Sequence, residues 1–209
     1  MIKEPVIILA NGNYPRHKVP KGILNSGGFI VCCDGAINKL IKEGIEPNAI
    51  VGDLDSIEPN LKDIYKNKLF HIPDQSDNDL RKVIKWLETY KIIHATILGA
   101  TGLRDDHCLA NISTLAQFPT QINFTMVTDY GKFNTLQGEQ IFGSFYGEQV
   151  SIFSFDPTVK ITTHGLKYNL NESPLTSLYY GSLNCSIKDT FKLSISHGKI
   201  LIYQAFQIN

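Results

Sequence analysis

The chain has 209 residues, and its 20 lysines and arginines balance its 20 aspartates and glutamates. A protein that binds nucleic acid through phosphate contacts normally carries a basic excess or a basic stripe, whereas the cations here are scattered along the sequence. With 43% hydrophobic and 10% aromatic residues, the chain can bury one large core or two small ones. This composition excludes a disordered or low-complexity protein.

The apolar stretches of the chain are short. The longest, at 6–10 and 29–33, hold about five residues each, far fewer than the ~20 that cross a bilayer, so we expect no membrane span. The N-terminal residues lack the basic region and long apolar core of a secretory leader. The four cysteines lack metal-ligand spacing, and Cys32 and Cys33 suit no ordinary disulfide because strand neighbours point to opposite faces. We therefore expect a reduced, cytoplasmic protein without membrane or nucleic-acid partners.

The first part of the chain, up to about residue 128, alternates short β-rich runs with segments of helical period. Apolar residues at i, i+3, i+4 and i+7 predict amphipathic helices around 80–87 and 109–116. A third helix around 37–41 should end at Gly44, because glycine readily adopts the left-handed conformation that stops a helix. The alternation predicts an α/β domain with a mainly parallel, Rossmann-like sheet. The expected strands are 6–10, 29–33, 49–51, 69–72, 95–99 and 122–128.

The second part of the chain has a different character. After Asp129, glycines separate short alternating runs rich in Phe, Tyr, Ile, Ser and Thr, and no helical period remains. This pattern predicts an all-β sandwich or roll. We place the boundary near Tyr130, which gives an α/β domain at 1–129 and a β-sandwich domain at 130–209. The expected strands include 149–155, 160–163, 191–196 and 200–206.

Asp53 and Asp55 are the strongest local signal. They follow a predicted strand at i and i+2 and therefore project to the same side, where one divalent cation can meet both carboxylates. The carboxyl ends of the strands form the ligand crevice of an open α/β sheet, so this position suits a site for phosphate and Mg²⁺. An ordinary turn is the alternative, because Asp and Ser often bond their own backbone in turns.

A second acidic segment, 73–79, precedes the best amphipathic helix and carries three carboxylates. Asp77 or Asn78 can cap that helix, and acidic groups complement its positive end. Capping alone does not explain the density of like charges, which repel unless they share a cation. A metal or polar ligand is therefore the competing interpretation, and Lys82 follows one turn later.

Two further corners join a strand to a helix. The loop 98–107 contains glycines whose backbone N–H groups could approach phosphate oxygens, and Arg104 could clamp them. His107 beside Asp106 suggests either acid–base chemistry or ordinary packing in the first helical turn. The segment 33–38 places an Asp and a Gly at another corner. All four corners fall at the carboxyl ends of predicted parallel strands, which favours one shared crevice.

These motifs together resemble the thiamine pyrophosphokinase family, whose members transfer a pyrophosphoryl group from ATP to the thiamine hydroxyl and release AMP. The likeness covers nearly the whole chain, with five motifs in the family's order. They are D-G-A-I-N at 34–38, G-D-L-D-S-I at 52–57, P-D-Q-(three residues)-D-L-R-K at 73–82, the glycine loop at 99–107 and T-H-G-L-K-Y-N-L at 163–170.

The resemblance implies an N-terminal nucleotide-binding catalytic domain and a C-terminal β-sandwich that binds thiamine. It implies a homodimer whose site lies where the first domain of one subunit meets the second domain of the other, with Mg²⁺ and ATP as co-substrate. Matching motif positions implies a role for individual residues. Asp53, Asp55 and Asp79 would hold Mg²⁺, and Asp79, Arg104 and Asp106 would act in catalysis. The residues implied to bind ATP are Asn11, Asp34, Gly35, Asn38, Gln75, Lys82 and Arg104, and those implied to bind thiamine are Tyr168, Ser182 and Asn184.

The sequence departs from the family pattern at three places. Asn78 stands where the family has Thr, Ala36 replaces a glycine, and Gly181-Ser182-Leu183-Asn184 replaces a Ser-Asn pair that receives the aminopyrimidine ring. Either Asp79 or Asp106 could accept the proton of the thiamine hydroxyl. Two other functions compete: a pyrophosphokinase acting on a different ring alcohol, such as a hydroxymethyl pterin, and a sensor that binds nucleotide or thiamine diphosphate without turnover.

Overall fold

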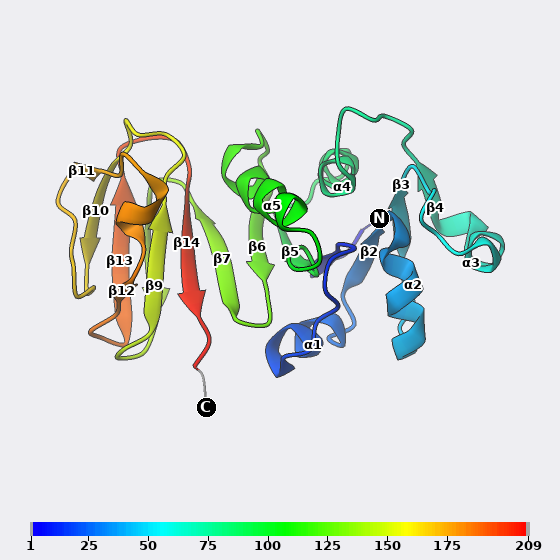
Figure 1. The fold of residues 1–209 in the computed structure, drawn as a ribbon, viewed down its shortest axis with the longest axis horizontal. Coiled ribbons are helices and arrows are strands. Elements are labelled where there is room, and N and C mark those ends of the chain that lie inside the picture. Colours follow the sequence, from blue (N-terminus) through cyan, green and yellow to red (C-terminus); the bar gives the residue numbers. More distant parts are fainter. Residues whose placement is uncertain (1, 208–209) are drawn as a thin grey trace. The chain divides into compact units, whose positions relative to one another are not determined.

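The computed structural model describes residues 2–207, which divide into two compact units. Unit 1 contains the described residues up to 114 together with 119–129, and unit 2 contains 115–118 and the residues from 130 onward. Unit 1 combines helices with a sheet, whereas unit 2 consists mainly of strands (Figure 1). The prediction of an α/β part followed by a β-rich part is therefore confirmed.

The sheet of unit 1 has the strand order β6-β5-β1-β2-β3-β4, and each neighbouring pair is parallel. Every residue of β1 and β3 is buried, because helices and loops cover a parallel sheet and its central strands are apolar throughout. The ends of these strands agree with the predicted ranges to within one residue. The strands are β1 (Val6–Leu9), β2 (Phe29–Cys33), β3 (Ala49–Gly52), β4 (Leu69–His71), β5 (His94–Leu98) and β6 (Asn123–Val127).

The helices of unit 1 follow from apolar spacing and end signals. In α4 the predicted apolar residues are buried, and the helix contacts β2 and β3. The third predicted helix is present as α2 and η2, and Gly44 ends it with a φ of 73°. In α5, by contrast, Leu109 is 63% exposed, so only part of the apolar face predicted for 109–116 is buried in the core. The helical segments are α1 (Lys18–Leu24), η1 (Asp34–Ala36), α2 (Ile37–Leu40), η2 (Ile41–Glu43), α3 (Pro59–Ile64), η3 (Lys66–Lys68), α4 (Asp79–Glu88) and α5 (Asp105–Gln117), which runs on into unit 2.

Unit 2 contains two groups of antiparallel strands, ordered β12-β9-β14-β7 and β11-β10-β13-β8. Apolar residues from both groups share one buried cluster, in which the rings of Phe142 and Phe191 stack at 5.2 Å. The elements are β7 (Gly131–Leu136), β8 (Glu139–Gly143), β9 (Gln149–Phe153), β10 (Lys160–His164), β11 (Ser173–Pro174), η4 (Leu178–Gly181), β12 (Asn184–Cys185), β13 (Thr190–Ile195) and β14 (Ile200–Ala205).

The predictions about membrane spans and cysteines can also be compared with the described part of the chain. Within residues 2–207, none of the helices has the length and apolar character needed to cross a bilayer. Cys32, Cys33, Cys108 and Cys185 are free thiols. Burial raises the pKa of the Cys32 and Cys33 thiols, so both stay protonated at neutral pH.

Candidate active site

One cavity of about 440 Å³ gathers the predicted corners of unit 1. Its walls come from the loops after β1, β3, β4 and β5, the end of β2, the start of α4 and the first half of α5. Because all these strands are parallel, their carboxyl ends meet at one edge of the sheet, where open α/β sheets bind ligands. The volume lies in the range of small-ligand pockets.

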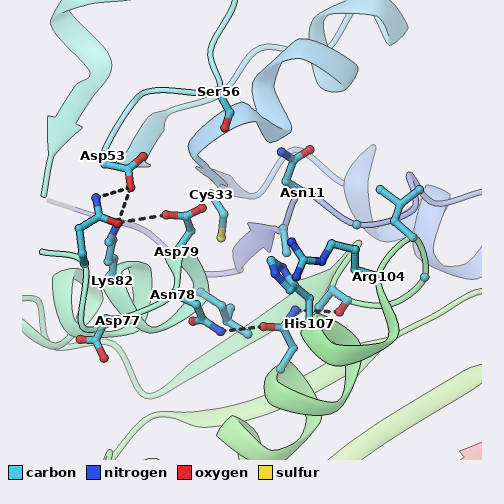
Figure 2. Close-up of a pocket in the computed structure, with 18 residues that line it drawn as sticks. Asn11, Cys33, Asp53, Ser56, Asp77, Asn78, Asp79, Lys82, Arg104 and His107 are labelled. Atoms are coloured by element: carbon cyan, nitrogen blue, oxygen red, sulfur yellow. Dashed lines mark hydrogen bonds and ion pairs between the residues drawn. The ribbon is translucent and has the colours of Figure 1, made fainter. Parts of the chain in front are cut away.

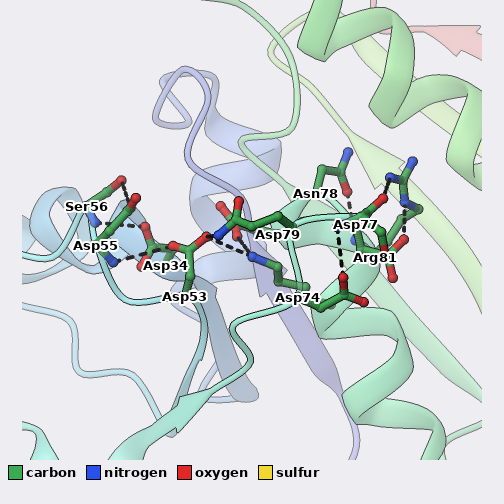
Figure 3. A network of polar contacts seen from close by, with 12 residues as sticks. Asp34, Asp53, Asp55, Ser56, Asp74, Asp77, Asn78, Asp79 and Arg81 are labelled. Carbon is green, nitrogen blue, oxygen red and sulfur yellow. Dashed lines mark hydrogen bonds and ion pairs between the residues drawn. The ribbon is translucent and has the colours of Figure 1, made fainter.

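Three carboxylates gather beside this cavity. Asp34, Asp53 and Asp55 each offer one oxygen atom, and these atoms lie within 4.8 Å of one another (Figure 3). Asp34 is 1% exposed, and its Oδ2 accepts a hydrogen bond of 3.1 Å from the Ser56 backbone N–H. Its Oδ1 is buried and finds no hydrogen-bond partner within residues 2–207. Burial raises the pKa of this carboxyl above its ordinary value.

This cluster fits a divalent cation. Hard cations such as Mg²⁺ take oxygen ligands, and a buried carboxylate oxygen without a partner is costly unless a ligand completes it. Asp53 and Asp55 belong to the set that the resemblance implies, and Asp34 lies with them. Asp79, the third residue of that set, bonds Lys82, as Asp53 also does.

Lys82 is the cation that engages Asp79. Its Nζ lies 2.9 Å from Asp53 Oδ2 and 3.3 Å from Asp79 Oδ1, and its side chain is 2% exposed. Figure 2 shows Asp53, Asp79 and Lys82 together on one side of the cavity. Burial disfavours the ammonium form, but the two carboxylates outweigh it and raise the pKa of Lys82. The hydrogen bond from Lys82 lowers the pKa of Asp53, whereas burial raises that of Asp79.

The acidic segment before α4 serves partly as a helix start. Asn78 is the N-cap, and its side chain accepts a hydrogen bond of 2.9 Å from the Arg81 backbone N–H. Asp77 pairs with Arg81 at 2.8 Å and with Lys85. Cations of the same helix thus compensate the charge of Asp77, and Asp79 forms an ion pair with Lys82.

The glycine loop after β5 is joined to the loop after β1 through backbone hydrogen bonds. The Gly12 N–H donates to Gly99 O at 2.7 Å, and the Asn13 N–H donates to Thr101 O at 2.9 Å. A Cβ at Gly12 would lie 2.4 Å from Gly99 O and 2.6 Å from Thr101 O, so only glycine allows this approach. The two loops therefore form one wall of the cavity.

Arg104 and His107 lie on the side of the cavity opposite Lys82 (Figure 2). Arg104 binds Asp106 through two hydrogen bonds of 3.1 and 2.6 Å, and this pairing lowers the pKa of Asp106 to about 2. Asp106 does not line the cavity within the described residues. Arg104 can face an anionic ligand, whereas Asp106 holds the guanidinium.

Left-handed backbone conformations occur at four non-glycine residues of the predicted motifs. The φ angles are 41° at Asp34, 66° at Leu54, 65° at Leu103 and 61° at Leu183. Each such residue costs about 1–3 kcal/mol and persists only where surrounding contacts enforce it, most often at functional sites. Three of these residues flank the cavity of unit 1, which strengthens its assignment as a functional site.

The residues that the resemblance assigns to ATP fall into two groups. Asn11, Gln75, Lys82 and Arg104 line the cavity, whereas Asp34, Gly35 and Asn38 are not part of its lining. Asn38 braces the loop that follows β3, because its amide donates to Ser56 O at 2.8 Å and accepts from the Glu58 N–H at 3.1 Å.

Two residues of unit 1 were not identified from the sequence. Lys39 Nζ donates to Gly12 O at 2.7 Å and to Asn11 O at 3.3 Å, so it holds the loop after β1. Asn111 lines the cavity and bonds both neighbouring loops. Both lie on helices, where no local motif marks them. Their role depends on backbone carbonyls or side chains that only the fold brings near.

In unit 2 the residues assigned to thiamine lie close together. Asn184 is buried, and its amide accepts from the Tyr168 N–H at 3.1 Å and donates to Tyr168 O at 2.7 Å. Tyr168 is 61% exposed, and Lys167 Nζ lies 5.3 Å from the centroid of its ring. Ser182 Oγ donates to Tyr179 O at 2.7 Å. Asn184 therefore positions the segment that presents Tyr168.

Comparison with known families agrees with these features. The family model for the thiamin pyrophosphokinase catalytic domain matches residues 21–127, and the model for the thiamin pyrophosphokinase substrate-binding domain matches residues 131–203. The chain belongs to the thiamin pyrophosphokinase family. The known activity of this family is the transfer of pyrophosphate from ATP to thiamine.

Individual relatives show how far the similarity extends. Thiamin pyrophosphokinase 1 of Caenorhabditis elegans is 32% identical over 107 residues, which cover 47% of this chain and 44% of that protein. Thiamine pyrophosphokinase 2 of Oryza sativa subsp. japonica is 28% identical over 204 residues, covering 83% of this chain and 75% of that protein. The crystal structure of thiamine pyrophosphokinase from Bacillus subtilis superposes with a TM-score of 0.80 at 21% identity, covering 97% of this chain and 99% of that chain, and shows a shared fold.

Proposed function

We propose that this chain transfers a pyrophosphoryl group from ATP to the hydroxyl of thiamine and releases AMP and thiamine diphosphate. The observation that carries the proposal is the cavity of unit 1, which has Lys82 and Arg104 in its walls and the Asp34, Asp53 and Asp55 carboxylates gathered at one side. Carboxylates that can hold a cation, beside fixed positive side chains, suit a triphosphate ligand. The match to the catalytic-domain model covers these residues.

Asp53 and Asp55, with Asp34 beside them, are the residues proposed to hold Mg²⁺. The partnerless Oδ1 of Asp34 supports this assignment. When bound, the cation would neutralise charge on the phosphate oxygens during transfer. Asp79, which the resemblance also assigns to Mg²⁺, is proposed as a further ligand, and its Oδ1 bonds Lys82 in this structure.

Transfer to thiamine needs a group that accepts the hydroxyl proton. We propose Asp79, because it lines the cavity and, among the hydrogen bonds of residues 2–207, only its Oδ1 is held, by Lys82. Both oxygens of Asp106 bind Arg104, which makes Asp106 a weaker proton acceptor. Asp106 instead orients Arg104, and Arg104 compensates charge on the triphosphate. Asn11, Gln75 and Lys82 complete the ATP contacts of the cavity.

The domain roles form part of the same proposal. Residues 1–129 act as a Rossmann-like nucleotide-binding domain, and residues 130–209 act as a β-sandwich that binds thiamine through Tyr168, Ser182 and Asn184. The shared core of the two strand groups supports the sandwich. The ring of Tyr168 supports the thiamine role, because an exposed aromatic face that already attracts an ammonium group can receive a cationic thiazolium.

We propose further that the protein acts as a homodimer, in which residues 1–129 of one subunit and residues 130–209 of the other build each site. The resemblance of five motifs to the family supports this arrangement. The free thiols of all four cysteines support a reducing, cytoplasmic compartment.

The proposal is tested by incubating the purified chain with ATP, Mg²⁺ and thiamine and quantifying AMP and thiamine diphosphate. We expect equal amounts of both products and none after chelation of the metal. A parallel reaction replaces thiamine with a hydroxymethyl pterin, and another omits the acceptor. AMP formation only with the pterin would reassign the substrate. Binding of ATP or thiamine diphosphate without any turnover would identify a sensor instead.

A further inference from the structure

Asn111 on α5 connects the two loops that carry the proposed catalytic groups. Its Oδ1 accepts a hydrogen bond of 3.1 Å from Asn78 Nδ2, and its Nδ2 donates to Ala100 O at 2.9 Å. Asn78 is the N-cap of α4 and directly precedes Asp79, while Ala100 lies in the glycine loop that leads to Arg104. Figure 2 shows the bond from Asn78 beside the cavity.

The direction of this chain of hydrogen bonds is fixed at both ends. At one end the Arg81 backbone N–H donates to Asn78 Oδ1 at 2.9 Å, and at the other end the Ala100 carbonyl can only accept. Each side chain between them must therefore accept one hydrogen bond and donate the next. An amide does this, and a hydroxyl does it too, whereas a carboxylate or an aliphatic side chain does not.

The hydrogen bonds from Asn78 through Asn111 to Ala100 connect the two sides of the cavity. Asp79 lies in the first turn of α4, so the position of the Asn78 cap determines where its carboxylate lies. The Ala100 carbonyl belongs to the loop that places Arg104 on the opposite side of the cavity. A single side chain of α5 thus bridges the loops that carry the proposed proton acceptor and the proposed phosphate clamp.

We propose that Asn111 is a positioning residue that holds the acidic loop and the glycine loop in register through Asn78, an inference that rests on the proposed pyrophosphoryl transfer. In this role Asn111 acts through its two neighbours, Asn78 and Ala100. The family's Thr at the position of Asn78 is compatible with this role, because a hydroxyl can also accept one hydrogen bond and donate another.

The test uses two substitutions of Asn78 that differ in polarity. Asn78→Asp has the same shape and keeps a good cap, since Asp is a favoured N-cap that also complements the helix dipole, but it cannot donate to Asn111. Asn78→Thr keeps both the acceptor and a donor. Asn111→Leu removes both bonds without changing charge. Ser113→Ala on the same helix is the control, because in the described part of the chain Ser113 Oγ bonds only the Ala110 carbonyl of its own helix.

We expect Asn78→Asp and Asn111→Leu each to lower kcat about 10-fold or more, since small misplacements of reacting groups carry costs of this size. Asn78→Thr should retain most of the kcat, and Ser113→Ala should retain all of it. The double variant Asn78→Asp/Asn111→Leu should be no slower than the slower single variant, because both changes break one chain of bonds. Additive losses, or equal losses in Asn78→Asp and Asn78→Thr, would overturn the proposal.

Two further readouts separate this role from others. The melting temperature of Asn78→Asp should match that of the wild type, whereas a purely structural role would make activity and stability fall together. Hydrogen exchange of the amides at 101–104 should accelerate in both Asn78→Asp and Asn111→Leu, and unchanged exchange would contradict the proposed coupling. This readout needs no turnover. An inactive wild type would therefore refute the proposed function, while the exchange data would still decide whether Asn111 couples the loops.

Discussion

Unit 1 and unit 2 use their polar side chains in opposite ways. In unit 1 the charged groups of the cavity bond other charged side chains, as Lys82 does with Asp53 and Arg104 does with Asp106 beside it. In unit 2 the polar groups of the 163–170 motif and Asn184 bond backbone atoms and leave an aromatic ring exposed. Charges that bond one another can exchange those bonds for a phosphate or a cation. Side chains that bond the backbone instead fix the shape of a surface.

This difference predicts different consequences for substitutions. A change in the cavity of unit 1 should affect turnover, because groups that compensate developing charge contribute most in the transition state. A change around Tyr168 should affect thiamine binding, since the ring offers contact area and a face that attracts cations.

The largest effect is expected for the paired aspartates. Asp53→Asn or Asp55→Asn should lower turnover at least ~100-fold, as loss of one major electrostatic contributor commonly does. Folding should persist, because Lys82 keeps its bond to Asp79 in either variant. Steady-state AMP release and a thermal melt, measured on the same preparations, check both statements. Near-normal turnover in both variants would remove the metal assignment.

A smaller effect is expected for the exposed ring of unit 2. Tyr168→Ala should weaken thiamine binding about 2- to 15-fold, which corresponds to the roughly 0.5–1.5 kcal/mol of an aromatic contact, and should leave ATP affinity unchanged. Tyr168→Phe keeps the ring and is the matched control. Calorimetric titration with thiamine and with ATP measures both affinities. If thiamine binds Tyr168→Ala as tightly as it binds the wild type, the ring has no part in recognition.

The smallest effect concerns the stability contributed by Asp34. Burial raises the pKa of the Asp34 carboxyl, so its ionised form destabilises the folded state. The protonated form contributes its full share to the free energy of unfolding below the ordinary pKa of 3.8, and this contribution is lost as the pH rises through the raised pKa. In the presence of a chelator at pH 7, Asp34→Asn should therefore melt above the wild type. A gain of about 1 kcal/mol corresponds to about 2–4 °C in a chain of this size. Asn tolerates the left-handed φ of this position as Asp does.

The melting curves of Asp34→Asn carry two internal controls. The difference from the wild type should shrink as the pH falls toward 3.8, where the wild-type carboxyl is protonated. Added Mg²⁺ should raise the melting temperature of the wild type more than that of the variant, because ligand binding stabilises the folded state. A wild type that melts above the variant in chelator at pH 7 would show that Asp34 is satisfied without a cation.

The strands and main helices of unit 1 could be predicted because their signal is local. A buried parallel strand is a short apolar run, and α4 repeats its apolar residues at helical spacing. α1 and α3 were not predicted, because both are short and are defined by the residues at their starts. His17 caps α1, and a proline begins α3. In unit 2, β7 and β8 lacked a clear alternating pattern, and pairing with β14 and β13 defines them.

For the candidate site, the sequence allowed prediction of the motifs and their positions but not of the contacts between their side chains. The sequence indicated which corners carry acidic residues and glycines, because the strand ends place them at one edge. Side-chain pairing was not predicted. Asp77 pairs with Arg81 and Lys85 of the adjacent helix α4, and these pairs depend on where that helix begins. The bond between Asn111 and Asn78, which are 33 positions apart, follows only from the packing of α5 beside the start of α4. The cap at Asn78 was one of two alternatives that local rules allowed, and the structure selects it.

The division of work between the two parts of the chain is tested most directly by combining subunits with different lesions. One chain carries Asp53→Asn, and the other carries Tyr168→Ala together with Asn184→Ala. Co-expression with two tags and double-affinity purification yields the heterodimer, whose AMP release is measured at thiamine concentrations below KM. If each site uses residues of both subunits, one site carries all the lesions and the other carries none, so we predict about half of the wild-type activity per dimer. Activity no higher than the mean of the two parent variants would contradict the shared site.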